Sequence, residues 1–266
     1  MVKKFLALAF LAGYLAGTAS ADNIIYGATS NGVLYSIIPT TGATTRIGNM
    51  GTTMYDIADY DGKLYGINSA SDLYSINTTT AAATEIGATG DALNALTFNS
   101  SGVLYAAGQN LSKLYTINLT TGQATPVAGE TNTTAYETAG DLEFIGNTLY
   151  ITTNGTNTSN LETVNLTTGA LTMLGSTGYN DVYGLAYSGG VLYGFTDAGT
   201  TYDVIRLNLT TGAGTLVHTY TPTGFYGTTD DPYNLPEPGT FVLLAAGLGA
   251  VIALPLRRRF RRFERA

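Results

Sequence analysis

The sequence contains no cysteine and no tryptophan, and it has a single histidine among its 266 residues. Without cysteine the chain has no disulfides, no thiolate ligands for zinc and no cysteine nucleophile. The sequence also lacks a Gly-x-Ser-x-Gly nucleophile elbow, a His-Glu-x-x-His metal pair and a glycine-rich phosphate loop. Stability must therefore come from buried apolar and aromatic side chains, and we assign no catalytic residue.

Positive charge is scarce over most of the chain. Between Asp22 and Asn234, four basic residues are set against seventeen acidic ones, a net charge of about −13. Such a surface repels nucleic acid and anionic lipid, so we expect no nucleic-acid partner. Helix-favouring residues are few, whereas threonine, tyrosine, glycine and asparagine are plentiful. This composition is typical of an all-β protein.

Residues 1–21 have the pattern of a secretory signal peptide. Two lysines precede an apolar stretch that ends near Gly17, and Ala19 and Ala21 then complete a small-x-small cleavage site. We expect the mature protein to begin at Asp22. An N-terminal membrane anchor is the alternative, and the shortness of the apolar run disfavours it.

The C-terminal end combines three features in a fixed order. Pro236, Glu237 and Pro238 hold an extended segment, because proline cannot continue a helix and restricts the residue before it. Residues 241–256 are largely apolar and would form a transmembrane helix of about 24 Å. Five arginines then act as a membrane stop that keeps the tail of residues 257–266 in the cytoplasm. They are Arg257, Arg258, Arg259, Arg261 and Arg262.

This arrangement resembles the PEP-CTERM sorting signal, a Pro-Glu-Pro motif followed by a short transmembrane helix and an arginine-rich end. The resemblance implies processing near Pro236, Glu237 and Pro238, in the linker of residues 231–240, by a membrane-embedded exosortase. It also implies a Gram-negative bacterium that makes extracellular polysaccharide, with an inner-membrane-anchored precursor that is sorted to the cell surface or matrix. The sortase signal Leu-Pro-x-Thr-Gly is a rival interpretation, which we reject because Pro238 stands where that signal needs its threonine.

One phrase recurs five times in the middle of the chain, with spacings of 39, 41, 47 and 43 residues. A second phrase, such as KLYGINS or VLYGFTD, precedes each copy, and both phrases alternate like strands between Gly, Asn and Ser turns. The recurring phrase reads LYSIIPTTG from Leu34, LYSINTTTA from Leu73, LYTINLTTG from Leu114, LETVNLTTG from Leu161 and VIRLNLTTG from Val204.

The repeats predict a β-propeller over residues 22–230, since four strands in about 42 residues make one blade. In the second unit we expect strands at about 54–60, 63–69, 72–77 and 82–87. Small residues should mark the innermost strands, where blades converge, and Ala58, Ala95 and Gly184 fit that place. Outermost strands should tolerate edge residues, and Pro126, Arg46 and Glu85 fit there.

The first unit lacks an inner strand, because the mature chain starts directly at the phrase NIIYGATS. Residues 221–230 are the remaining candidate to pair beside residues 24–29. We therefore predict five four-stranded blades closed by the N- and C-terminal segments. The alternatives are an open or solenoidal β array, or a sixth blade supplied by a partner chain.

Acidic residues near the inner strands are the candidate site. Asp56 and Asp141 fall at equivalent positions of their units, with Asp91 and Asp181 nearby, and Glu143 close to Asp141. Paired carboxylates serve glycoside hydrolysis when their separation is about 5–9.5 Å. We interpret these residues instead as solvated acids at the mouth of the channel.

Two further features receive structural interpretations. The single histidine, His218, falls at the end of an outermost strand, far from the channel, where we expect a surface residue without a role. Calcium is one use for the acids of DIADYDG, although the spacing is not that of an EF-hand. We interpret Asp61-Gly62 as a type I′ hairpin turn, and we assign no metal or cofactor.

Two classes of function follow. The first is a non-enzymatic binding or structural propeller that is exported and associated with extracellular polysaccharide or another surface ligand. The alternative is a secreted glycan hydrolase or lyase that uses carboxylates at the channel mouth. The lack of a catalytic motif favours the first.

Overall fold

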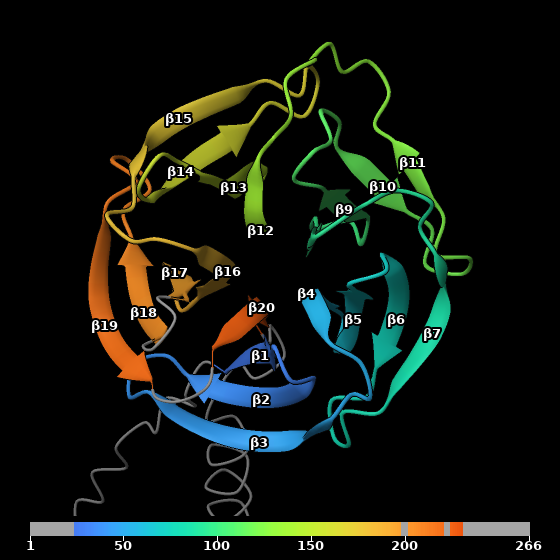
Figure 1. Ribbon diagram of the computed structural model, residues 1–266, viewed down its shortest axis with the longest axis vertical. Helices are drawn as coiled ribbons and strands as arrows, with labels where there is room; N and C mark the ends of the chain where they lie inside the picture. The colour runs from blue at the N-terminus through green and yellow to red at the C-terminus, as the bar shows by residue number, and fades with distance from the viewer. Residues whose placement is uncertain (1–23, 198–201, 221–223, 231–266) are drawn as a thin grey trace, which may run out of the picture. The chain divides into compact units, whose positions relative to one another are not determined.

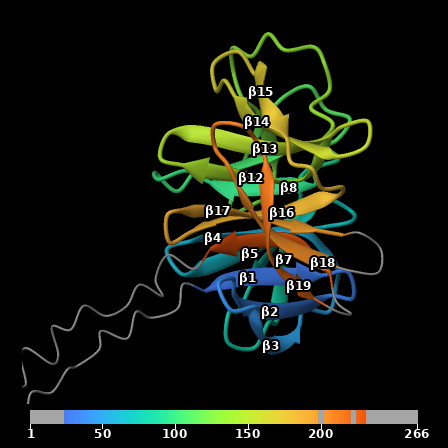
Figure 2. The same ribbon diagram turned by 90° about the vertical axis from the view of Figure 1, so that its left-hand side faces the viewer.

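The computed structural model describes residues 24–197, 202–220 and 224–230, which belong to one compact unit spanning residues 22–234. The described strands form five four-stranded antiparallel sheets around a central axis (Figure 1). Figure 2 shows the same ring edge-on. The predicted signal peptide, Pro-Glu-Pro motif, transmembrane helix and arginine-rich tail lie outside the described residues.

The first three blades follow one order from the axis outwards. Blade 1 consists of β20 (Phe225–Asp230), β1 (Ile25–Thr29), β2 (Val33–Ile38) and β3 (Ala43–Asn49). Blade 2 consists of β4 (Met54–Tyr60), β5 (Lys63–Asn68), β6 (Asp72–Ile76) and β7 (Ala83–Ala88). Blade 3 consists of β8 (Ala95–Phe98), β9 (Leu104–Ala107), β10 (Tyr115–Ile117) and β11 (Ala124–Pro126).

The last two blades repeat that order. Blade 4 consists of β12 (Thr138–Ile145), β13 (Thr148–Asn154), β14 (Ser159–Val164) and β15 (Leu171–Ser176). Blade 5 consists of β16 (Val182–Ser188), β17 (Val191–Thr196), β18 (Tyr202–Leu207) and β19 (Gly214–Tyr220). The predicted all-β fold with five four-stranded blades is confirmed. In the described residues no helix has the length and hydropathy needed to cross a membrane.

The ring is closed by the two ends of the described chain. β20 pairs antiparallel with β1, with Ile25 opposite Asp230 and Gly27 opposite Thr228. This pairing supplies the inner strand that the first repeat lacks, so the predicted closure is confirmed and the open β array is wrong. The side chain of Phe225 is 3% exposed and packs with Tyr35 and Phe195.

Strand boundaries in blade 2 agree with those predicted from its turns to within one residue. Asp61 and Gly62 connect β4 to β5 with φ angles of 57° and 68°. Two successive positive φ angles between paired strands fit the type I′ turn, which confirms that interpretation. The small residues Ala58, Ala95 and Gly184 lie on the innermost strands β4, β8 and β16.

The core lies between the blades. Among the described residues, five clusters of buried apolar side chains each combine residues of two neighbouring blades. One cluster, for example, joins Ile67 and Leu73 of blade 2 to Leu96 and Leu104 of blade 3. Because burying one such side chain stabilises the fold by about 1.5–3 kcal/mol, each blade depends on both of its neighbours.

Outermost strands pack against the turn of the next blade. A Cβ added to Gly87 on β7 would lie 2.5 Å from the carbonyl oxygen of Thr121, in the turn that follows β10. The side chain of Asn118 holds this turn, since its Oδ1 accepts the N–H groups of Thr120 and Thr121 at 2.8 and 3.1 Å. Asn165 and Asn208 do the same in their own turns. The Asn-Leu-Thr-Thr-Gly phrase is therefore a docking turn.

His218 lies on the outermost strand β19, as predicted, and away from the axis. It is half-buried rather than fully exposed, because it packs against Gly42 in the turn of blade 1. Its ring also contacts that of Tyr220, with the centroids 4.8 Å apart. His218 therefore contributes to the seam between the last and first blades.

Candidate binding site

Four innermost strands shift register against the next strand of their blade, and on three of them, β4, β16 and β20, the extra residue is a tyrosine. On β4 the pairing with β5 skips from Met54 to Asp56 and leaves Tyr55 without a partner. The same irregularity leaves Tyr183 on β16 and Tyr226 on β20 unpaired. A bulge bends its strand and redirects the side chain of the extra residue. The three bulges present their tyrosines at one end of the ring.

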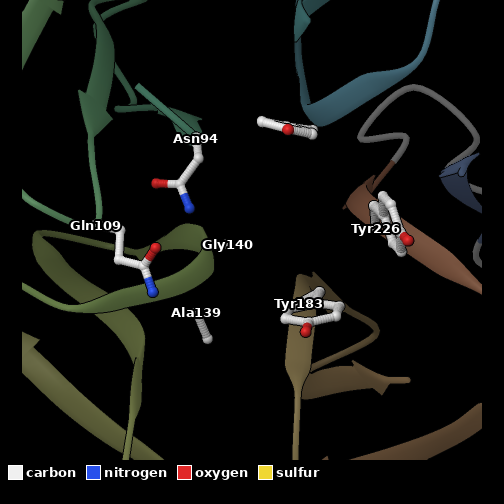
Figure 3. Close-up of a pocket in the computed structure, with 7 residues that line it drawn as sticks. Asn94, Gln109, Ala139, Gly140, Tyr183 and Tyr226 are labelled. Carbon is white, nitrogen blue, oxygen red and sulfur yellow. The ribbon is translucent and has the colours of Figure 1, made fainter. Parts of the chain in front are cut away.

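These tyrosines line a pocket of about 300 Å³ (Figure 3). Asn94, which precedes β8, and Gln109, which follows β9, lie across the pocket from Tyr183 and Tyr226. All five blades contribute, because β12 of blade 4 adds its own residues to the wall. The complete described lining is Tyr55, Asn94, Gln109, Ala139, Gly140, Tyr183 and Tyr226.

Aromatic side chains dominate one side of this pocket. The rings of Tyr183 and Tyr226 meet edge to face, with centroids 5.7 Å apart and planes at 84°. Burial, followed by the negative charge of Asp181, raises the pKa of Tyr183 to about 12, so its hydroxyl stays protonated near neutral pH. Tyr55 is 39% exposed. The pocket thus offers open aromatic surface and hydroxyl groups.

Amide groups face the tyrosines. The Oδ1 atom of Asn94 is buried and has no hydrogen-bond partner among the described atoms. A buried acceptor without a donor costs about 1–3 kcal/mol, and such exceptions need an explanation. Gln109 beside it is exposed. The two side chains together supply donors and acceptors but no charge.

The two acids next to this layer in the sequence are not solvated. Asp56 and Asp141 follow Tyr55 and Gly140 on their strands, and both are 0% exposed. The prediction that they are solvated acids at the channel mouth is therefore wrong. Each carboxylate instead accepts a backbone N–H of the following blade, Asp56 from Leu96 at 2.6 Å and Asp141 from Leu185.

Asp56 and Asp141 are also hydrogen-bonded to each other. Burial raises the pKa of both carboxyls well above the ordinary value. Because the two carboxyls are in contact, they titrate as a pair, and the pair holds a proton at a pH where a solvated carboxyl is ionised. Two carboxyls in direct contact cannot flank a glycosidic bond, which requires a separation of about 5–9.5 Å.

Similar hydrogen bonds join the inner strands around the whole ring. Oε1 of Glu143 accepts the N–H of Tyr187 at 3.0 Å, and its carboxylate also bonds the side chain of Thr97. The hydroxyl of Thr228 donates to the carbonyl of Leu185 at 3.0 Å. The N–H of Asp59 donates to the hydroxyl of Thr229 at 3.1 Å. With the two aspartates, these bonds connect every pair of neighbouring blades.

The other two candidate acids lie apart from this pair. Asp91 precedes β8 and is hydrogen-bonded to the hydroxyl of Tyr115. Asp181 precedes β16 and accepts a hydrogen bond from the hydroxyl of Tyr183, which lines the pocket. In the described residues no three acidic or histidine side chains gather as a metal site would require. Of the acids in DIADYDG, Asp56 accepts the N–H of Leu96 in blade 3, and Asp61 forms the hairpin turn between β4 and β5.

Sequence reasoning missed the pocket residues. The signal was present, because an apolar residue, a tyrosine and then a glycine or aspartate recur as Met-Tyr-Asp, Val-Tyr-Gly and Phe-Tyr-Gly at the same place in three repeats. Only the bulges show that these tyrosines face the axis. Asn94 and Gln109 follow no repeated phrase that would have marked them.

Comparison with known proteins finds solved structures of similar fold but no matching family. No protein-family model and no curated protein matches the sequence. A structural-genomics protein of unknown function from Bacteroides thetaiotaomicron is similar with a TM-score of 0.50 and 16% identity, over 79% of this chain. This chain spans 62% of that protein. A chain of a nidogen/laminin complex has a TM-score of 0.49 and 12% identity, over 78% of this chain and 97% of its own length.

Proposed function

We propose that the protein is an exported surface or extracellular-matrix protein of the PEP-CTERM type, whose propeller binds extracellular polysaccharide without chemical turnover. The observation that carries the proposal is the uncharged pocket of tyrosine and amide side chains at one end of the ring. Pockets that hold a ligand combine aromatic walls with a few convergent polar groups, and this pocket has both.

The inner-strand acids support binding rather than hydrolysis. Asp56 and Asp141 are the equivalent carboxylates that a glycan hydrolase or lyase would have used, and they are buried in contact with one another. Glu143 is 7% exposed and is bonded to the next blade. The enzyme alternative therefore loses its equivalent pair of carboxylates, and of its other candidates Asp91 is bonded to Tyr115 and Asp181 to Tyr183.

The two ends of the sequence support the proposed localisation of the protein. The signal peptide with Ala19 and Ala21 directs export, and the Pro236-Glu237-Pro238 segment directs processing by an exosortase. Polysaccharide is then the proposed partner, because sorting of this type accompanies its secretion. The membrane is a temporary partner through residues 241–256.

Co-sedimentation tests the binding. The full chain is mixed with the polysaccharide of its own host, and the bound fraction is measured against chain concentration. The polysaccharide is afterwards sized by chromatography, with and without added calcium. Saturable binding with unchanged polymer length is the expected result. Shortening of the polymer, or no binding at any concentration, would overturn the proposal.

A further inference from the structure

We propose that the axial pocket is a subsite for one neutral sugar residue, held between Tyr55, Tyr183 and Tyr226 on one side and the amides of Asn94 and Gln109 on the other. This inference rests on the proposed function and assigns its site and its chemistry. The residues of this subsite are distinct from the buried acids Asp56, Asp141 and Glu143, which join the blades.

The aromatic side of the pocket suits the apolar face of a sugar ring. A pyranose presents several C–H groups on one face, and an aromatic ring offers a flat surface on which they pack. Tyr55 keeps 39% of its surface exposed, although tyrosine is a large apolar side chain. Tyr183 and Tyr226 stand edge to face at 5.7 Å, which leaves two surfaces at right angles. Together the rings form a corner rather than a flat patch.

The same three tyrosines are placed by backbone irregularities. In each bulge one residue gives up its pairing with the neighbouring strand, which weakens the ladder locally. Bulges of this kind are found next to functional sites, where they redirect a side chain. Three of the four register shifts in the innermost strands place a tyrosine at the pocket, and the fourth, on β12, places Ala139 and Gly140 there.

The opposite side of the pocket suits hydroxyl groups. An amide carries both a donor and an acceptor, as does a sugar hydroxyl, so two amides can bond two neighbouring hydroxyls. Gln109 is exposed and Asn94 is half-buried, so both amide side chains can be reached from the pocket. The Oδ1 atom of Asn94 is enclosed by the protein, so Asn94 offers the pocket its side-chain N–H₂ donor, which points that way in Figure 3.

Charge restricts the ligand further. The described lining contains no charged residue, whereas Asp181 and Asp197 lie close enough to Tyr183 to act on its hydroxyl. This negative surrounding disfavours an acidic sugar such as a uronate. An organic cation would gain from aromatic faces, but the two amides would then have no hydroxyls to bond. A neutral sugar satisfies both walls.

The volume fits a single unit of a longer chain. At about 300 Å³ the cavity is at the small end of the range of roughly 300–1,000 Å³ for ligand sites. The pocket is open at the end of the ring, so neighbouring units of a polymer can extend outside it. The proposed subsite therefore recognises one residue of a polysaccharide.

Calorimetric titration of the full chain with four probes tests this assignment. The probes are cellotetraose and mannotetraose as neutral oligosaccharides, tetragalacturonate as an acidic one, and tetramethylammonium as an organic cation without a hydroxyl group. Because the chain has no tryptophan, tyrosine fluorescence gives a second reading of the same site. The variants are Tyr55→Ala, Tyr226→Phe and Asn94→Ala, each checked for an unchanged melting temperature.

Tyr60→Ala is the matched control. Tyr60 ends the same strand, β4, at its other end and is 37% exposed, against 39% for Tyr55. We expect a neutral oligosaccharide to bind and to quench tyrosine fluorescence. Tyr55→Ala should weaken this binding about three- to tenfold, and Asn94→Ala should weaken it too. Tyr226→Phe should retain most of the affinity, and Tyr60→Ala should leave it unchanged.

Two kinds of failure are distinguishable. Neutral sugar or host polysaccharide that binds equally well to Tyr55→Ala and Asn94→Ala would place the ligand elsewhere, while the proposed binding function would stand. Preference for tetragalacturonate or for tetramethylammonium would overturn the neutral-sugar assignment. If neither the oligosaccharides nor the host polysaccharide binds the wild-type chain, both proposals fail.

Discussion

Asp56 of blade 2 and Asp141 of blade 4 share a hydrogen bond in the interior of the ring, although blade 3 separates their strands. Each also accepts a backbone N–H from the blade that follows it. The pair thus links four of the five blades through two side chains. Its protonation state must affect the stability of the whole ring.

Stability should fall as the pH rises above about 4. The pKa values of Asp56, Asp141 and Glu143 are raised in the folded state, so between the unfolded and folded values the native protein binds more protons than the unfolded chain. Their contribution is complete below the unfolded values of about 4 and decreases with rising pH. The melting temperature, followed by circular dichroism, should fall by more than about 3 °C between pH 5 and pH 8.

A variant separates this pair from other ionisable groups. Asp141→Asn removes the charge coupling with Asp56, so the dependence of melting temperature on pH should become shallower whatever the absolute stability. Glu85→Gln, on the exposed part of β7, is the control and should retain the wild-type slope. A melting temperature that rises from pH 5 to pH 8 would contradict this account.

Ring closure by β20 should account for much of the stability. Phe225 is 3% exposed in the cluster between blades 1 and 5, and truncation of such a residue costs about 3–5 kcal/mol. Phe225→Ala should therefore lower the melting temperature by about 6–20 °C. Leu216→Ala on β19, the strand that precedes β20 in the sequence, should change stability by less than about 0.5 kcal/mol, because its side chain is 50% exposed.

Deletion of residues 221–230 extends this test. It removes β20 and leaves β1 with an unpaired edge, which exposes its backbone groups to aggregation. We expect a large loss of melting temperature together with oligomers in size-exclusion chromatography. A deletion variant that melts like the wild type would show that closure is not important for stability.

The third prediction concerns the glycines of the outermost strands, which lie close to the backbone of a turn in the next blade. A Cβ added to Gly175 on β15 would collide with the carbonyl oxygen of Thr211 in the docking turn of blade 5. Gly175→Ala must separate the two blades locally, at a cost of about 1–3 kcal/mol. Gly178→Ala is the comparison, since Gly178 has no atom within 4 Å of the added Cβ, and its φ of 77° alone penalises alanine.

Chemical denaturation measures this difference. The free energy of unfolding should be lower for Gly175→Ala than for Gly178→Ala, with similar m-values because both variants expose the same surface on unfolding. Equal free energies for the two variants would mean that the turn does not pack against the strand in solution.

The repeats made most of the fold predictable from the sequence, whereas the residues of the candidate site were not predictable in this way. The period, the Asn-Leu-Thr-Thr-Gly turn and Asp61-Gly62 are local features, and local features fix strand boundaries and register. The role of Asp56 depends on Leu96 and Asp141 in two other blades. Contacts of this kind are set by assembly of the ring, so the local sequence around Asp56 does not indicate that its carboxyl group is buried.

The same reason explains why the tyrosines of the pocket were overlooked. Tyrosine is common in β-strands whatever its role. Tyr55, Tyr183 and Tyr226 therefore cannot be recognised as pocket residues from their strand positions alone. The bulges that redirect them appear only in the pairing of β4, β16 and β20 with their neighbours. A tyrosine repeated before Asp or Gly in innermost strands is a usable signal for such bulges.

The C-terminal motif supplies the last prediction, which concerns residues outside those that the structure describes. Glu237 between two prolines should direct cleavage, because the extended segment suits a protease active site and stands directly before an apolar run. Mass spectrometry of the protein exported by its own host should find a C-terminus near residue 238. The arginine-rich end should then be absent from the mature surface protein.

Substitution at the motif tests the cause of the cleavage. Glu237→Ala should leave the tail attached and retain the chain in the membrane fraction, while the propeller keeps its wild-type melting temperature because the change lies beyond β20. Arg265→Ala is the control, since it removes a charge from the same tail but leaves five arginines before it. An intact tail on the wild-type surface protein, or normal processing of Glu237→Ala, would contradict sorting through this motif.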